Sequence, residues 1–159
     1  MRGNVACENI FILELEIICL DFMEREKFES EFLESICEDI KRSGKISDEN
    51  FNKLSAAFGS RFIKAWRAIK DGRIKKYIFK PSGRVVWIVV GKRRDYLVMP
   101  DAVFCTCNDF YFHVMSQKAY LCYHLIGQKI AESLGKYDVI EESDELYDFL
   151  MREWKTVMP

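Results

Sequence analysis

Apolar residues recur with a helical period in the first half of the chain and again near its end. The segment from Glu24 to Lys41 carries such a stripe, and a second runs from residue 51 to 69 behind a Ser47 or Asp48 cap. Arg61, Lys64, Arg67 and Lys70 fall on the other side of that second helix. The spacing also predicts a helix after residue 122 that ends at Gly135. A last helix, capped by Ser143, is expected to turn these apolar side chains inward: Leu146, Phe149, Leu150 and Trp154.

Between the helical segments the pattern changes to that of strands. Residues 74–80 lead into the turn Pro81-Ser82-Gly83, and the wholly apolar, β-branched run 85–90 follows. A second turn at 91–95 precedes a third strand at 96–99. We therefore predict an antiparallel meander with 85–90 as its central strand. Helices, then a sheet, then helices indicate an α+β protein.

Charge is distributed unevenly along the 159 residues, although the net charge is only −1. Residues 61–96 hold 12 Lys/Arg against 2 acidic residues, which gives +10, while the segments before and after carry −6 and −5. Such asymmetry indicates a local anion-binding face, and the alternative is a set of solvated outer surfaces. The candidate nucleic-acid-binding residues are Lys75, Lys76, Lys80, Arg84, Lys92, Arg93 and Arg94.

The cysteines do not follow the pattern of a secreted disulfide scaffold. Cys7, Cys19 and Cys37 are scattered and are interpreted as core residues. The most apolar stretch, 10–23, is interrupted by acidic residues, so it is not predicted to span a membrane. With no signal segment, we expect a reduced, intracellular protein, cytoplasmic or, in a eukaryote, nuclear. Because a Glu-rich helical segment starts at Met23, residues 1–22 are hypothesised to be an over-extended start.

The other three cysteines lie within 20 residues of a histidine. Cys105-Thr106-Cys107, a 14-residue spacer and Cys122-Tyr123-His124 supply three thiolates and one imidazole. Side chains at i and i+2 point the same way in an extended segment, so the first two thiolates can reach one ion, and the second pair opens a helix, whose free N–H groups favour bound thiolates. Cys105, Cys107, Cys122 and His124 therefore predict one tetrahedral zinc ion, structural because no position is open for water. The alternatives are cysteines that serve only as small core residues, and His113 as a substitute ligand.

These residues resemble the SWIM zinc finger. Asn108-Asp109-Phe110 and the lead-in Lys80 to Arg84 are also similar to that family, and the resemblance covers about residues 73–135. The motif after the finger resembles the SWIM subunit of Shu-type recombination mediators and archaeal SWIM proteins, with Gly127 where an alanine is expected. That resemblance implies a role in DNA recombination or repair and a RecA/RadA-family recombinase paralogue as partner.

The sequence thus predicts a non-catalytic zinc protein that binds nucleic acid, with DNA favoured over RNA. Tyr77, Phe79, Trp87 and Tyr96 could stack on bases, with core packing as the alternative. The second hypothesis is a protein adaptor, motivated by the apolar run 110–112 and the Trp154 helix. A zinc deaminase is not expected, because the chain lacks an H-x-E segment and an open zinc position. No small-molecule substrate is expected.

Three regions are expected along the chain. Residues 1–70 would form an N-terminal helical region, and 71–140 the zinc-finger domain with its antiparallel strands and helix. Residues 141–159 would add a C-terminal helix packed on the same core.

Overall fold

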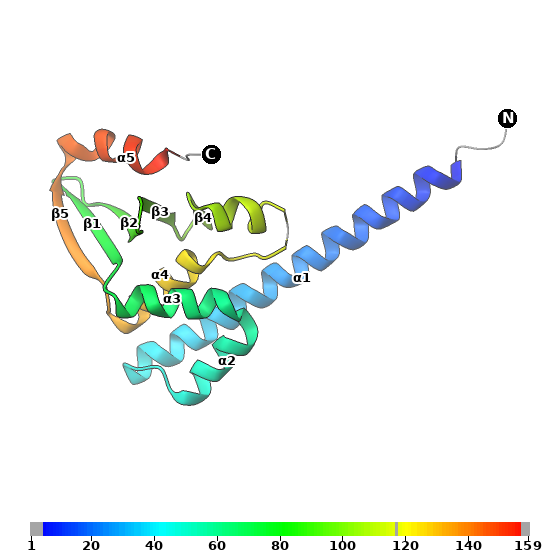
Figure 1. Cartoon of the computed structure of the whole chain (residues 1–159), viewed down its shortest axis with the longest axis horizontal. Helices are drawn as coiled ribbons and strands as arrows, with labels where there is room; N and C mark the ends of the chain where they lie inside the picture. Colours follow the sequence, from blue (N-terminus) through cyan, green and yellow to red (C-terminus); the bar gives the residue numbers. More distant parts are fainter. Residues whose placement is uncertain (1–4, 117, 157–159) are drawn as a thin grey trace.

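The computed structural model describes residues 5–116 and 118–156, and side chains within these ranges from residue 19 onward (Figure 1). Its architecture is α+β, as predicted: helices, a five-stranded sheet, a cysteine-rich site and a C-terminal helix. The helices are α1 (Val5–Ser43), α2 (Asp48–Phe58), α3 (Ser60–Lys70), α4 (Tyr123–Leu134) and α5 (Tyr147–Lys155). The strands are β1 (Ile74–Lys80), β2 (Arg84–Val90), β3 (Asp95–Met99), β4 (Phe104–Cys105) and β5 (Asp138–Ser143). Two short helices, η1 (Phe110–Val114) and η2 (Asp144–Leu146), complete it.

The N-terminal helices differ from the prediction in their bounds. Helix α1 is 39 residues long, because no glycine or proline interrupts the chain between Val5 and Ser43. Its N-terminal part extends away from the remainder of the fold in Figure 1. The second predicted helix is two helices, broken at Gly59, whose φ of 55° a non-glycine residue rarely adopts. In the described part of the chain, no helix is both long enough and apolar enough to cross a membrane.

The cysteines of α1 were interpreted as core residues, and that holds for one of them. Cys37 is buried, whereas Cys19 is exposed. The interpretation of Cys19 was wrong because this part of α1 has few neighbours, and Leu20 and Met23 are 61% and 60% exposed as well. The side chain of Cys7 lies outside the described residues.

The predicted meander is present, and the sheet has the order β4-β3-β2-β1-β5. Strands β1 to β4 pair antiparallel, with the apolar β2 at the centre. Strand β5 was not predicted. It pairs parallel to β1 and spans the boundary that the sequence suggested at residue 140. Only two of its six residues are apolar, so β5 owes its conformation to its pairing with β1 rather than to its own pattern.

Both faces of the sheet are covered, which explains why β2 is apolar from Val85 to Val90. Trp87 and Val89 face α1 to α4 in the larger core, whereas Val86 and Ile88 face α5 in a smaller cluster with Met151 and Trp154. Helix α5 therefore lies on the opposite face from the core on which it was expected to pack (Figure 1).

Two of the side chains predicted to face inward from this C-terminal segment are on the surface. Phe149 is 66% exposed and Leu146 44% exposed. Met151 takes the inward position instead, because a single helix over one sheet face buries only a narrow stripe.

Helices α3 and α4 approach each other closely on the larger core. Ala65 of α3 and Gly127 of α4 are both buried, and a Cβ placed on Gly127 would lie 3.5 Å from the Cβ of Ala65. That separation is an ordinary van der Waals contact, so alanine would also fit here. This packing fixes the position of the α4 N-terminus, where the second half of the cysteine site begins.

Candidate metal centre

The first pair of candidate ligands is held by the edge of the sheet. Cys105 is the last residue of β4, and Thr106 follows it beside β3. The hydroxyl of Thr106 accepts a hydrogen bond from Leu97 N at 3.0 Å, and Thr106 N donates to Leu97 O at 3.1 Å. Arg94 Nη2 donates to Thr106 O at 2.7 Å. These bonds anchor Thr106, which lies between the two cysteines, so Cys105 and Cys107 are fixed on either side of it.

The second pair is set by the start of α4. Cys122 is the N-cap residue, in an extended conformation with φ −79° and ψ 164°, and His124 lies in the first turn. Unpaired N–H groups at a helix N-terminus stabilise negative charge, which favours a thiolate at this position. The local conformation therefore directs both side chains toward the end of β4.

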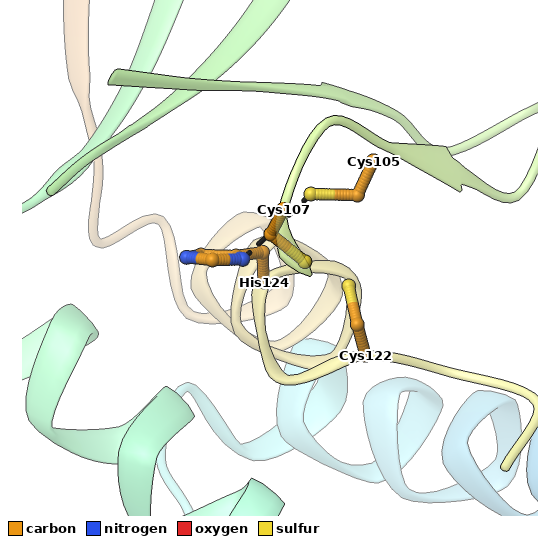
Figure 2. Close-up of side chains that lie close together, drawn as sticks. All are labelled: Cys105, Cys107, Cys122 and His124. Atoms are coloured by element: carbon orange, nitrogen blue, oxygen red, sulfur yellow. Dashed lines mark hydrogen bonds between the residues drawn. The ribbon is translucent and has the colours of Figure 1, made fainter. Parts of the chain in front are cut away.

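All four side chains converge on one point (Figure 2). Their ligand atoms lie within 4.8 Å of one another, and Cys105 Sγ is 3.7 Å from His124 Nδ1. The exposed fraction is between 1% and 3% for each residue. Zinc–sulfur bonds of ~2.3 Å in a tetrahedron place ligand atoms ~3.8 Å apart, so the group fits the ion. A single Cys3His site of this kind supports one structural zinc ion, as the sequence predicted. His113 is exposed and lies outside the cluster.

Aromatic rings enclose the histidine. The rings of Tyr96 and Tyr123 have their centroids 4.5 and 3.8 Å from that of His124. Nδ1 faces the thiols, while Nε2 is buried with no hydrogen-bond partner among the described residues. The ring is therefore oriented by packing, with Nδ1 as the nitrogen presented to an ion.

The three thiols influence one another's ionisation. Burial raises the pKa of Cys105 and of Cys122, because the charged thiolate is poorly solvated there. Hydrogen bonds from Cys105 and Cys122 lower the pKa of Cys107. A backbone bond of 3.2 Å from Phe110 N to Cys107 Sγ adds a further donor. The cluster thus concentrates negative charge on Cys107, and a divalent cation would displace the remaining thiol protons.

A buried ion pair holds the segment that leads into Cys122. Glu29 of α1 is 4% exposed and receives two hydrogen bonds from Arg61 of α3, at 2.8 and 3.0 Å. The same carboxylate accepts from Tyr120 N at 3.2 Å and Leu121 N at 2.9 Å. Arg61 Nη1 also donates to Leu121 O at 2.6 Å. Two helices therefore fix the backbone immediately before a zinc ligand.

Sequence reasoning missed this pair. Glu29 lies 32 residues from Arg61 and 92 from Leu121, so no local spacing could indicate the contact. Glu29 was assigned no role from the sequence, and Arg61 was placed on the basic side of its helix. Both carboxylate oxygens of Glu29 accept hydrogen bonds, which is the condition under which a buried carboxylate in an ion pair is tolerated.

Most of the basic residues predicted to contact nucleic acid have partners within the fold. Lys75, Lys80 and Arg84 form ion pairs with Asp138, Glu141 and Asp144, respectively.

The other four differ from one another. Lys76 lies over the rings of Trp87 and Tyr137, and Arg94 donates to the carbonyls of Thr106 and Thr156. Lys92 and Arg93 are exposed and form no ion pair with any described residue.

The aromatic residues considered for base stacking are largely in the core. Phe79 is 0% exposed and Trp87 6% exposed. Tyr77 and Tyr96 are half-buried, and each packs against a core residue, Trp154 and His124. Core packing, the alternative to base stacking, therefore accounts for the positions of these four side chains.

Comparison with known proteins places this site in a family. A Dictyostelium discoideum protein, zinc finger SWIM domain-containing protein 7 homolog, is 31% identical over 109 residues, 67% of this chain and 69% of its own. The chain belongs to the zinc finger SWIM domain-containing protein 7 family. Mouse zinc finger SWIM domain-containing protein 7 is 29% identical over 130 residues, 80% of this chain and 85% of its own. An uncharacterized Archaeoglobus fulgidus protein is 32% identical over 123 residues, 77% of this chain and 98% of its own. No family model and no solved structure matches the chain.

The SWIM resemblance inferred from the ligand spacing is thereby confirmed. In this SWIM finger, β4 supplies one half of the site and α4 the other, and η1 lies in the spacer between them. Gly127, which replaces the expected alanine, occupies a position with room for a methyl group. The departure from the SWIM pattern therefore does not disturb the packing of α4 that supports the site.

Proposed function

We propose that this SWIM protein is a non-catalytic adaptor in DNA recombination or repair that binds a protein partner beside its zinc finger. The observation that carries the proposal is a group of large exposed side chains on and after η1. Tyr111, Phe112 and Met115 are 61%, 61% and 65% exposed, and we call them the η1 patch. Exposed aromatic and methionine side chains that lie together are typical of protein interfaces.

The zinc finger supports the backbone that presents this patch. Phe110 N donates to Cys107 Sγ, and the side chains of Phe110 and Val114 are 8% and 9% exposed, so the opposite side of η1 is anchored in the core. The backbone amides of Lys118 and Ala119 both donate to His113 O. A rigid backbone lowers the entropic cost of binding, which favours an interaction surface over a flexible loop.

The proposed class of partner is a RecA/RadA-family recombinase paralogue. It follows from the resemblance to the SWIM subunit of Shu-type recombination mediators. The proposal that the protein is not an enzyme rests on the donor set: four protein ligands complete a tetrahedral zinc ion and leave no position for a reacting water.

A native pull-down with a matched control tests the adaptor. Tyr111→Ser with Phe112→Ser should abolish recovery of an ATPase partner, while one zinc per chain is retained. Phe149→Ser is the control, because Phe149 is equally exposed, at 66%, but lies on α5 across the sheet. Recovery of the same ATPase by both variants, or recovery of none by the wild type, would contradict the proposal.

Nucleic-acid binding is a second candidate function, compatible with the first. The observation that favours it is the β2–β3 turn, where Lys92 and Arg93 are exposed and unpaired with any described residue. Fluorescence anisotropy with DNA and RNA oligonucleotides across salt concentrations tests it. Lys92→Gln with Arg93→Gln should weaken binding and flatten its salt dependence. Arg94 is excluded from the variant, because its contacts with Thr106 brace the zinc site.

A further inference from the structure

One face of α3 carries basic side chains that the fold leaves largely unneutralised. Its basic residues follow each other at every third position, and Lys64, Arg67 and Lys70 are all exposed. Arg67 and Lys70 form no ion pair with any described residue. Lys64 forms one, a long contact of 3.8 Å with Asp109, and its side chain remains 55% exposed. We call these three residues the α3 face.

The basic hairpin of β1 and β2 is a useful contrast, because it comes from the same positively charged stretch of sequence. Strand β5 pairs with β1 and, with η2, brings Asp138, Glu141 and Asp144 against Lys75, Lys80 and Arg84. Three of the four basic residues of these strands are thus paired with an acidic residue, and the fourth, Lys76, lies over aromatic rings. Among the described residues, Asp109 is the carboxylate that pairs with a member of the α3 face, while Asp71, at the end of the helix, pairs with Arg73 instead.

A cavity of about 270 Å³ lies at the N-terminal end of this face, next to zinc ligand Cys122. Lys64, Lys118 and His113 line it, and Asp109 is the one carboxylate among the lining residues. Arg61 forms part of its wall and is held in place by Glu29. The cavity therefore has a wall held in place at Arg61 and two lysines in its lining, of which Lys64 also makes the long contact with Asp109, and a phosphate group is small enough to enter it.

We propose that the α3 face and this cavity bind the phosphodiester backbone of a nucleic acid. The inference rests on the second candidate function and assigns it to a different surface from the β2–β3 turn. From Lys64 to Lys70 the helix rises about 9 Å, and a strand advances roughly 3.4 Å per nucleotide, so the face spans two to three phosphates. Successive members of the face are about 4.5 Å apart along the axis and turn about 60° around it, so they form one oblique row of cations that a polyanion can follow.

The magnitude of the effect follows from counterion release. Three phosphate contacts to a single strand give a slope of about −2 for log affinity against log salt concentration. Binding by the wild type should then weaken roughly 20-fold between 50 and 200 mM salt, and removing the three charges should abolish most of that dependence.

Anisotropy with labelled single- and double-stranded DNA and single-stranded RNA tests the inference on the full chain. The test variant combines Lys64→Gln, Arg67→Gln and Lys70→Gln. A control of equal charge combines Lys27→Gln, Lys41→Gln and Lys45→Gln, which are exposed and lie on or directly after α1. Zinc content and the unfolding temperature of every variant establish that the fold is intact. We expect the test variant to lose at least tenfold in affinity and the control less than twofold.

Three outcomes would overturn the inference. If only Lys92→Gln with Arg93→Gln weakens binding, nucleic-acid binding stands but belongs to the turn. If the wild type binds no oligonucleotide, both ideas fail, while the adaptor is judged separately by the pull-down. If a poly-glutamate peptide binds the α3 face as tightly as the oligonucleotides do, the surface recognises acidic protein instead.

Discussion

The two faces of the sheet are stabilised in different ways. On the face covered by α1 to α4, the large apolar core is supplemented by a metal site and by the buried Glu29–Arg61 pair. On the other face, one helix covers a small cluster that is apolar throughout. Polar groups are used where many segments meet, because hydrogen bonds and ligand bonds are directional and set orientation as well as stability. A single amphipathic helix over a flat face needs only hydrophobic burial.

The largest expected effect is loss of the metal site from the helical face. Cys107→Ser should release zinc and lower the free energy of unfolding by about 5 kcal/mol, since metal loss is among the severe classes of damage. Hydrogen exchange should rise in η1 and at the start of α4, while β1, β2 and α5 keep their protection. Cys37→Ser is the control, because Cys37 is buried but outside the cluster. Unchanged zinc content in Cys107→Ser would refute the assigned ligand set.

The opposite face should respond strongly to one aromatic residue. Trp154 is 4% exposed and packs against Tyr77 at a ring distance of 4.8 Å. Trp154→Ala should cost about 3–5 kcal/mol in chemical denaturation, with one zinc per chain retained. Phe149→Ala, at an exposed position on the same helix, should change stability by less than about 0.5 kcal/mol. If Trp154→Ala also lost zinc, the two faces would be coupled. Arg94 could couple them, because it donates both to Thr156 O after α5 and to Thr106 O between two zinc ligands.

Glu29 tests how the helical face positions the metal. Glu29→Gln leaves the part-buried Arg61 without its counter-charge and weakens the hydrogen bonds at a buried position, and it should cost about 3 kcal/mol in denaturation. Zinc transfer to a competing chelator should also become faster, because the backbone before Cys122 loses its support. Glu34→Gln, in an exposed pair with Lys129 at 3.3 Å, should leave both quantities nearly unchanged. If stability fell without faster zinc transfer, the Glu29–Arg61 pair would stabilise the fold without positioning the zinc ligand.

The smallest expected effect is a gain at the contact between α3 and α4. Gly127→Ala should raise the free energy of unfolding by about 0.5–1 kcal/mol, because alanine favours the helix and its methyl group meets Ala65 at an ordinary distance. Gly135→Ala should do the opposite, since Gly135 has a φ of 64°. Thermal unfolding of the two variants measures the contrast. A loss of stability in Gly127→Ala would show that the helices are packed more tightly than this geometry allows.

Several elements could be predicted because their signals are local. The turn at Pro81-Ser82-Gly83 and the apolar run of β2 gave the meander, and Gly135 gave the end of α4. Strand β5 escaped prediction, since four of its six residues are polar or charged and its conformation depends on β1. The inward-facing residues of α5 were only partly predicted, because which stripe of a short helix is buried depends on the surface that it covers.

The sequence by itself determined the zinc site. Side chains at i and i+2 share a direction in extended chain, and three cysteines and a histidine lie close together in sequence, so spacing alone named Cys105, Cys107, Cys122 and His124. Only the tertiary structure decided what the charged residues do. The basic stretch of sequence splits into a hairpin, where β5 and η2 pair with three of the basic residues, and a helix face that remains basic. Glu29 and Arg61 became an internal support for a zinc ligand. Electrostatic interactions depend on distance in space, and distant segments of chain acquire that proximity only on folding.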